Sequence, residues 1–211
     1  MNKGFFKIMA VICVLLAGTG CGKAEKRLEA TPDDKDSKNP VSQQTHEEAI
    51  NPGPNERAGE PMIVVFKRER ILELYSGDSL VGRYPIDLGR DPSGDKQKEG
   101  DGRTPEGTYY VCTRNEQSRY YLSLGVSYPN EEDAKKALEN GIIEEETYER
   151  IKAAEDNLSK PPWDTPMGGE IMIHGMGTGE DWTAGCIAVK NDVMDILWRS
   201  CPLGTPIIIH P

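Results

Sequence analysis

Between residues 21 and 61, this 211-residue chain contains almost nothing from which a folded core could be built. The segment is rich in Pro, Asn, Glu, Lys and Asp and nearly lacks large apolar side chains. It cannot bury enough surface to offset the entropy lost on ordering, so we predict a flexible tether with an extended reach of about 130 Å. The remaining residues, 62–211, suffice for one domain with its own core.

Residues 1–20 have the layout of a secretory signal peptide. Two lysines precede an uncharged apolar stretch, residues 8–17, which is too short for a comfortable membrane span. Small residues then lead directly to Cys21, a pattern that resembles a bacterial lipoprotein signal and implies that Cys21 is lipidated. A plain signal peptide and an uncleaved anchor remain alternatives. In each case we expect the domain in the cell envelope, facing the periplasm or the exterior.

The charge of the chain excludes one class of partner. The formal net charge is −10, and because residues 1–20 carry two lysines and no acidic residue, the chain from Cys21 onward carries −12. Such a chain repels phosphate backbones, so we expect no nucleic-acid partner. We also expect no second membrane span, because no long apolar stretch follows the signal.

Residues 62–211 combine strand patterns with helix patterns. Short apolar runs bounded by turn residues predict strands at 62–66, 70–75, 80–86, 170–174 and 205–210, and the second and third of these form a hairpin. Helices are predicted at 130–140, 147–157 and 192–200, capped by Asn130, Thr147 and Asn191. The sequence therefore predicts a mostly β domain with about three short helices packed against it.

One pair of residues can carry nucleophilic chemistry. Cys186 follows His174 by twelve positions, with strand-like runs before the histidine and after the cysteine. A thiol with a pKa of about 8.5 is mostly protonated at neutral pH, so a nucleophilic cysteine needs a base, and histidine is the commonest one. Neither residue has further metal ligands at zinc spacing, and the acidic loop 91–102 lacks the spacing of a calcium loop, so we expect no metal or cofactor.

Three motifs resemble one family. In chain order they are Thr104-Pro105-Glu106-Gly107, Ile173-His174-Gly175 and Ala184-Gly185-Cys186-Ile187. The L,D-transpeptidase (YkuD-like) catalytic domain contains three similar motifs in the same order. The resemblance covers residues 62–211 and implies a β-sandwich-like fold. It also implies that Cys186 attacks a carbonyl of a peptidoglycan stem peptide, with His174 as general base and then acid.

The resemblance assigns roles to the neighbours of this pair. The backbone carbonyl of Gly175 would orient the His174 ring, and the backbone N–H of Gly185, together with that of Cys186, would face the oxyanion of the tetrahedral intermediate. We expect Thr183 and Trp182 to contact substrate, although packing is the alternative for the tryptophan.

Two positions depart from the family pattern. The family usually has a histidine where this chain has Ala184 and an arginine or asparagine where it has Ala188. These losses are typical of a divergent subgroup of the family. They leave undecided whether the acyl group is transferred to an amine or to water. We favour acyl transfer to an amine of another stem or of an envelope protein. Hydrolysis, as an L,D-carboxypeptidase or amidase, is the first alternative, and an inactive lipoprotein that binds peptidoglycan is the second.

The remaining cysteines permit one disulfide. If Cys13 leaves with the signal, Cys21 is lipidated and Cys186 stays reactive, only Cys112 and Cys201 can pair. An oxidising compartment favours such a bridge, which would add about 4–5 kcal/mol in the chain-entropy model. Two buried free thiols are the alternative.

Overall fold

The computed structural model describes residues 59–211. The predicted signal peptide, the predicted lipidation site Cys21 and residues 21–58 of the predicted tether lie outside the described residues, whereas Pro61, its last predicted residue, already belongs to β1. The chain elements, in order, are β1 (Pro61–Phe66), β2 (Ile71–Ser76), β3 (Ser79–Pro85), β4 (Gly107–Ser118), β5 (Tyr121–Val126), α1 (Glu131–Glu139), α2 (Glu145–Asp156), β6 (Met172–His174), β7 (Ile187–Ala188), α3 (Asn191–Ser200) and β8 (Pro206–His210).

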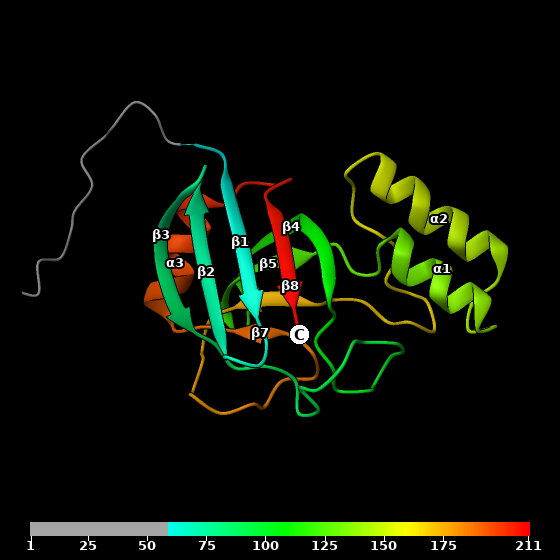
Figure 1. Cartoon of the computed structure of the whole chain (residues 1–211), viewed down its shortest axis with the longest axis horizontal. Coiled ribbons are helices and arrows are strands. Elements are labelled where there is room, and N and C mark those ends of the chain that lie inside the picture. Colours follow the sequence, from blue (N-terminus) through cyan, green and yellow to red (C-terminus); the bar gives the residue numbers. More distant parts are fainter. Residues whose placement is uncertain (1–58) are drawn as a thin grey trace, which may run out of the picture. The chain divides into compact units, whose positions relative to one another are not determined.

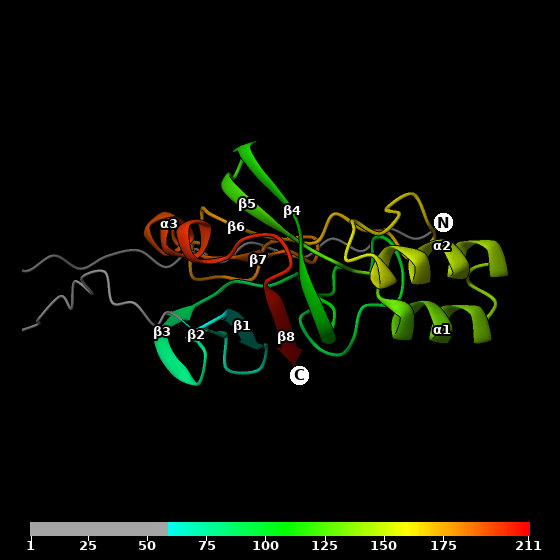
Figure 2. The same ribbon diagram turned by 90° about the horizontal axis from the view of Figure 1, so that it is seen from above.

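The strands form one curled sheet. Its order is β3-β2-β1-β8-β4-β5-β6-β7, with parallel pairing in β1–β8 and β6–β7 and antiparallel pairing elsewhere. The twelve-residue β4 pairs with β8 through its first half and with β5 through its second, so it joins the two halves of the sheet. Figure 2 shows β1, β2, β3 and β8 on one side and β5, β6 and β7 on the other. The predicted sandwich-like β fold is confirmed.

A short segment after β3 brings the ends of this sheet together. Asp87 exchanges backbone hydrogen bonds of 2.9 Å with Ala188 of β7. Leu88 accepts a backbone hydrogen bond from Thr183, whose own carbonyl accepts from Arg90, both at 3.1 Å. The Asp87 carboxylate also accepts hydrogen bonds from the backbone of Thr178 (2.6 Å) and Gly179 (2.9 Å). The loop between β6 and β7 is therefore fastened along much of its length.

One hydrophobic core lies between the two halves of the sheet. It includes fully buried residues of β1 and β2, such as Ile63 and Leu72, together with Leu124, Ile173 and Ile187 of β5, β6 and β7. Three successive residues of β1 are buried, which is the pattern of a strand covered on both faces. The apolar run 62–66, which has no polar alternation, fits this burial.

The helices lie at two ends of the domain. Figures 1 and 2 place the antiparallel pair α1 and α2 beyond one end of the sheet and α3 at the other. Asn130 caps α1 in a capping box with Asp133, as its sequence predicted. The predicted cap Thr147 is wrong, because α2 begins at Glu145 after the N-cap Glu144. Two glutamates then stand in its first turn, where the helix dipole favours negative charge.

Two further boundaries differ from the predictions. The N-cap of α3 is Lys190, so Asn191 is helical, and its side chain instead accepts a hydrogen bond of 2.8 Å from the backbone of Met176. The strand predicted from residue 170 begins at Met172, because Glu170 has a φ of +54°, which is incompatible with a strand. Both differences arise beside the loop that follows His174.

A buried ammonium fastens the loop after β3 to the sheet. Lys67, only 2% exposed, donates from Nζ to the carbonyls of Gly94 (2.7 Å) and Thr104 (2.8 Å) and to Oε1 of Glu106 (2.7 Å). A buried charge is tolerable when it is paired and hydrogen-bonded in this way. The Thr-Pro-Glu-Gly motif of the sequence therefore supplies two of the three acceptors that hold Lys67.

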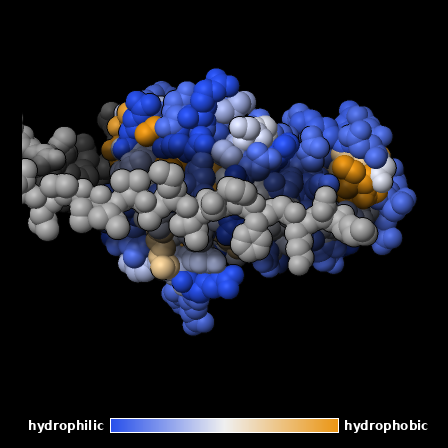
Figure 3. Space-filling model, turned by 90° about the horizontal axis from the view of Figure 1, so that it is seen from below, coloured by the Kyte–Doolittle hydropathy of each residue, from blue (hydrophilic) through white to orange (hydrophobic). Residues whose placement is uncertain are grey.

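The surface of the domain is largely polar. On the part of one face that is visible in Figure 3, hydrophilic residues predominate and hydrophobic ones form small separate spots. Within residues 59–211, none of the three helices has the length and apolarity needed to cross a membrane.

The disulfide considered from the sequence is absent from the structure. Cys112 and Cys201 are both free thiols, the first partly buried and the second fully buried. Burial raises the pKa of each to about 12, so neither is an accessible thiolate at neutral pH. The alternative of two free thiols therefore holds, with Cys201 buried and Cys112 partly buried.

We predict that the purified protein migrates equally on reducing and non-reducing gels, because Cys112 and Cys201 are free. Alkylation under denaturing, non-reducing conditions should label both residues, as read by peptide mass spectrometry. Protection of both from the alkylating reagent until reductant is added would contradict the prediction.

We also predict that Lys67→Met lowers the free energy of unfolding by about 2–4 kcal/mol, because it leaves three buried or half-buried acceptors without their donor. Urea denaturation measures the change. Lys98→Met changes an exposed lysine of the loop that Lys67 fastens, so it is the matched control and should change stability by about 0.5 kcal/mol or less. Equal stabilities of the two variants would show that the Lys67 contacts contribute nothing.

Candidate active site

A cleft of about 970 Å³ opens beside the loop that joins β6 to β7. His174 and Cys186 both line it. The parallel register pairs Ile173 with Ile187 and His174 with Ala188. Because side chains alternate between the faces of a sheet, His174 and Cys186 project on the same face, one position on either side of the Ile173–Ile187 pair. The structure therefore brings the two predicted residues into one cavity.

The His174 ring is held in one orientation. Its Nδ1 lies 2.7 Å from the carbonyl oxygen of Gly175. A carbonyl can only accept a hydrogen bond, so Nδ1 carries the proton and Nε2 of the neutral ring is left as the base. The ring is 2% exposed, so this contact replaces water as its hydrogen-bond partner. The geometry expected of Gly175 from the family resemblance is present.

Two aromatic side chains enclose the His174 ring. Tyr120 stacks on it with ring centroids 4.7 Å apart, and Trp182 meets it edge to face at 5.7 Å. Tyr120 and Trp182 also contact each other at 5.6 Å. The predicted contact residue Trp182 therefore forms part of the wall that orients the base, and it also lines the cleft.

Cys186 lies at the floor of the cleft with its sulfur partly exposed. Its Sγ donates a weak hydrogen bond of 3.6 Å to the backbone carbonyl of Glu170. Glu170 adopts its positive φ at the turn that leads into β6, and this backbone conformation points the carbonyl at the sulfur. A residue just before β6 therefore helps to place the thiol.

Burial keeps both members of the pair uncharged. It lowers the pKa of His174 below its usual value, although the Gly175 carbonyl and the charge of Asp87 act in the opposite direction. Burial likewise raises the pKa of the Cys186 thiol, against the effect of the Met172 backbone N–H and of Lys96. At neutral pH the resting pair is therefore a thiol and a neutral imidazole.

Glycine is required on both sides of the pair by packing. A Cβ on Gly175 would lie 2.5 Å from Oδ1 of Asn191, and one on Gly185 would lie 2.5 Å from the carbonyl of Arg103. Gly185 also has a φ of +133°, which side chains disfavour. The absence of a side chain at Gly185 lets the backbone of Arg103, which precedes the Thr-Pro-Glu-Gly motif, approach the residue before the cysteine.

Thr183 shapes the cysteine loop from within. It is 4% exposed, and its hydroxyl donates to the carbonyl of Cys186 (2.8 Å) and accepts from the N–H of Gly185 (3.1 Å). This arrangement suits a residue that positions the loop better than the substrate contact predicted from the sequence. The Gly185 N–H would have to release Thr183 to bind an oxyanion, whereas the described residues offer the Cys186 N–H no acceptor.

The two positions that depart from the family pattern differ in location. Ala184 is exposed and lines the cleft, so the missing histidine leaves space at its mouth. Ala188 is fully buried and is not part of the cleft lining. Ala188 is the register partner of His174 in the β6–β7 pair, and the loss of a substrate contact at this position stays a prediction.

Three residues of the site escaped the sequence analysis: Arg119, Tyr120 and Glu170. Arg119 lies over the Tyr120 ring at 5.0 Å, and all three line the cleft. No motif marks Tyr120 as functional. Only the pairing of Ser123 with His174 places the β4–β5 turn beside the histidine. Within the described part of the chain, no group of three or more His, Cys, Asp or Glu side chains could hold a metal ion.

Known proteins match this domain along nearly its whole length. The profile of the L,D-transpeptidase catalytic domain, YkuD, matches residues 60–209. The Escherichia coli (strain K12) protein named "Putative L,D-transpeptidase YafK" is 33% identical over 149 residues, which are 67% of this chain and 47% of that protein. The chain therefore spans about half the length of this relative.

Solved structures support the fold. A mutant of the helical cell shape determining protein Pgp2 from Campylobacter jejuni matches 72% of this chain and 47% of its own chain, with 23% identity and a TM-score of 0.50. At this identity the likeness is one of fold alone.

We predict that His174 is neutral at pH 7, with the proton on Nδ1, because burial lowers its pKa and Gly175 accepts from that nitrogen. Nitrogen-15 NMR of the histidine rings distinguishes this tautomer from an imidazolium, and His174→Gln assigns the signal. On acidification the ring should gain its second proton only below its usual pKa of about 6.5. An imidazolium signal at pH 7 would show that the thiol and ring form an ion pair instead.

Proposed function

Because this chain belongs to the L,D-transpeptidase catalytic domain family, we propose that it catalyses cysteine-dependent acyl transfer on peptidoglycan stem peptides. The single observation that carries the proposal is the shared face of His174 and Cys186 in one cleft, with Nε2 of the ring left as the base. The family match and the match to YafK support peptidoglycan as the substrate.

The first half-reaction forms a thioester. His174 Nε2 takes the Sγ proton as the sulfur bonds to the substrate carbonyl carbon, and the carbonyl π electrons move to oxygen. When the intermediate collapses, the C–N bond breaks and the leaving nitrogen takes the proton from Nε2. A neutral resting pair suits this sequence, because the base accepts the proton only as the sulfur attacks.

The backbone of the cysteine loop stabilises the intermediate. The Cys186 N–H is the donor best placed for the developing oxyanion, because the Gly185 N–H is engaged by Thr183. A preorganised donor of this kind contributes about 3–4 kcal/mol in other enzymes. Tyr120 and Trp182 hold the imidazole in the orientation that proton transfer to and from the sulfur needs, during both half-reactions.

The second half-reaction transfers the acyl group to an acceptor. His174 removes a proton from an incoming amine, which attacks the thioester and releases the Cys186 thiolate, to be reprotonated by the ring. An amine of a second stem gives a cross-link, an amine of an envelope protein gives an attachment, and water gives hydrolysis. The proposal commits to amine transfer. Its setting is the cell envelope, with the chain anchored through lipidated Cys21.

We predict that the wild-type protein converts tetrapeptide-stem muropeptides to cross-linked dimers and that Cys186→Ala abolishes turnover, because no other group in the cleft can form the thioester. Mass spectrometry of products measures both, and a thioacyl adduct on Cys186 should be detectable in the wild type. Cys112→Ala is the control that removes a buried thiol outside the cleft.

Other products would change the conclusion. Shortened stems without dimers would assign hydrolysis in place of transfer. Binding to isolated cell wall that survives in Cys186→Ala, with no product from the wild type, would leave a peptidoglycan-binding lipoprotein as the function.

A further inference from the structure

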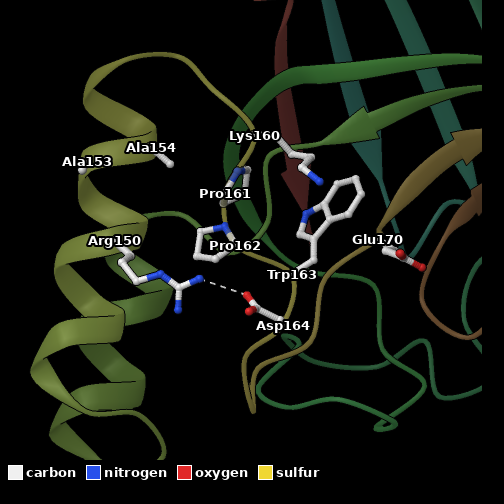
Figure 4. A pocket seen from close by; sticks show the side chains of 9 residues that line it. All are labelled: Arg150, Ala153, Ala154, Lys160, Pro161, Pro162, Trp163, Asp164 and Glu170. Atoms are coloured by element: carbon white, nitrogen blue, oxygen red, sulfur yellow. Dashed lines mark hydrogen bonds and ion pairs between the residues drawn. The ribbon is translucent and has the colours of Figure 1, made fainter.

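A second groove, of about 690 Å³, runs from the active-site cleft toward α2. Figure 4 shows the side chains that line it: Arg150, Ala153, Ala154, Lys160, Pro161, Pro162, Trp163, Asp164 and Glu170. Trp163 and Glu170 also line the cleft of Cys186, so the groove and the cleft adjoin at these two side chains. The groove is therefore one direction in which a substrate held at the sulfur can extend.

Glu170 stands where the two hollows meet. Its backbone carbonyl is 3.6 Å from the Cys186 sulfur, and its exposed side chain lines both cavities. Its charge acts on the thiol, because it is one of the groups that raise the pKa of Cys186. No residue within 59–211 forms an ion pair with this carboxylate at 4.0 Å or less.

The groove contains one further charge that is not neutralised by an ion pair. Asp164 is neutralised by Arg150, whose guanidinium lies 3.1 Å away. Lys160 has no carboxylate partner among the described residues, and its ammonium lies 4.3 Å above the centre of the Trp163 ring. A Cβ on Gly169 would lie 2.2 Å from the indole, so this glycine lets the ring pack against the backbone. In Figure 4 the indole stands between Lys160 and Glu170.

We propose that this groove binds the amine partner of the reaction as an amino-acid end, with Glu170 binding its ammonium and Lys160 its neighbouring carboxylate. This inference rests on the proposed function. The negative charge lies nearest the sulfur, where the nitrogen must be when its bond to the acyl carbon forms or breaks. The positive charge of Lys160 lies farther along the groove. There it can bind a carboxylate that is attached to the same carbon as the nitrogen.

The same site serves departure and arrival of the amine, because in both steps the nitrogen lies at the acyl carbon and exchanges a proton with His174. When the C–N bond breaks, the nitrogen takes one proton from His174 and a second from water, and the resulting ammonium is paired by Glu170. When an amine arrives as an ammonium, it first loses one proton to water, and His174 takes the second as the nitrogen bonds to the thioester carbon. Amines without an adjacent carboxylate lack the contact with Lys160 and are poorer partners.

Two stem peptides that differ at one group test the proposal. One ends in D-alanine with a free carboxylate, and the other ends in D-alaninamide, so only the charge that would face Lys160 changes. We expect the full chain to release D-alanine about tenfold faster, as kcat/KM, than D-alaninamide. Lys160→Gln should remove this preference by slowing only the first substrate, and Lys160→Arg should retain it.

Glu170 has a different expected signature. Glu170→Gln should slow release of both leaving groups by about the same factor, because each leaves as an amine. Glu139→Gln and Lys135→Gln are the matched controls, since both residues are exposed on α1 and lie outside both cavities. The controls should match the wild type for both substrates, and thermal melting of each variant verifies that it is folded.

Two outcomes separate this inference from the proposed function. A Cys186-dependent wild type whose substrate preference is unchanged in Lys160→Gln would overturn the groove assignment and leave the acyl-transfer function standing. A wild type that forms neither a Cys186 adduct nor product from either peptide would overturn the function, and the groove assignment with it.

Discussion

The buried ammonium of Lys67 is the contact on which the active site depends. It ties the end of β1 to the carbonyls of Gly94 and Thr104 and to Glu106, and so fixes the loop that passes beneath the cysteine. The carbonyl of Arg103, in that loop, then lies so close to Gly185 that no side chain fits. A charge in the low-dielectric interior must keep its hydrogen-bond partners. The Lys67 contacts therefore fix the position of the Arg103 backbone, and the Arg103 backbone limits where the cysteine loop can lie.

Burial, which holds the site together, also governs its reactivity. The environment that stacks Tyr120 on His174 removes water from the ring and lowers its pKa, and it raises the pKa of Cys186 for the same reason. The protein therefore does not hold a ready thiolate that would react with any oxidant or electrophile. In the proposed mechanism the cysteine becomes nucleophilic when substrate arrives and His174 accepts the proton, which links reactivity to occupancy of the cleft.

The positions of the charged residues in the cleft and the groove favour one orientation of a bound substrate. Arg90 and Arg119 line the main cleft, whereas Glu170 stands at its junction with the groove beside α2. The groove depends on α2 and on the proline-rich segment after it, which lie outside the sheet that holds the catalytic pair. Variation in these peripheral elements could change the amine partner while the cysteine and histidine stay in place.

The sequence alone determined strands β1, β2 and β3, the cap Asn130 and the pair His174 and Cys186, because these depend on local patterns and on residue types with particular chemistry. It misplaced the start of α2, where helix-favouring glutamates outweighed a threonine cap. Only the tertiary structure decided the orientation of His174, the engagement of Gly185 by Thr183, and the places of Lys67, Tyr120 and Glu170. Each of these depends on strand register and loop packing between distant segments, and no local pattern in the chain encodes which segments will meet.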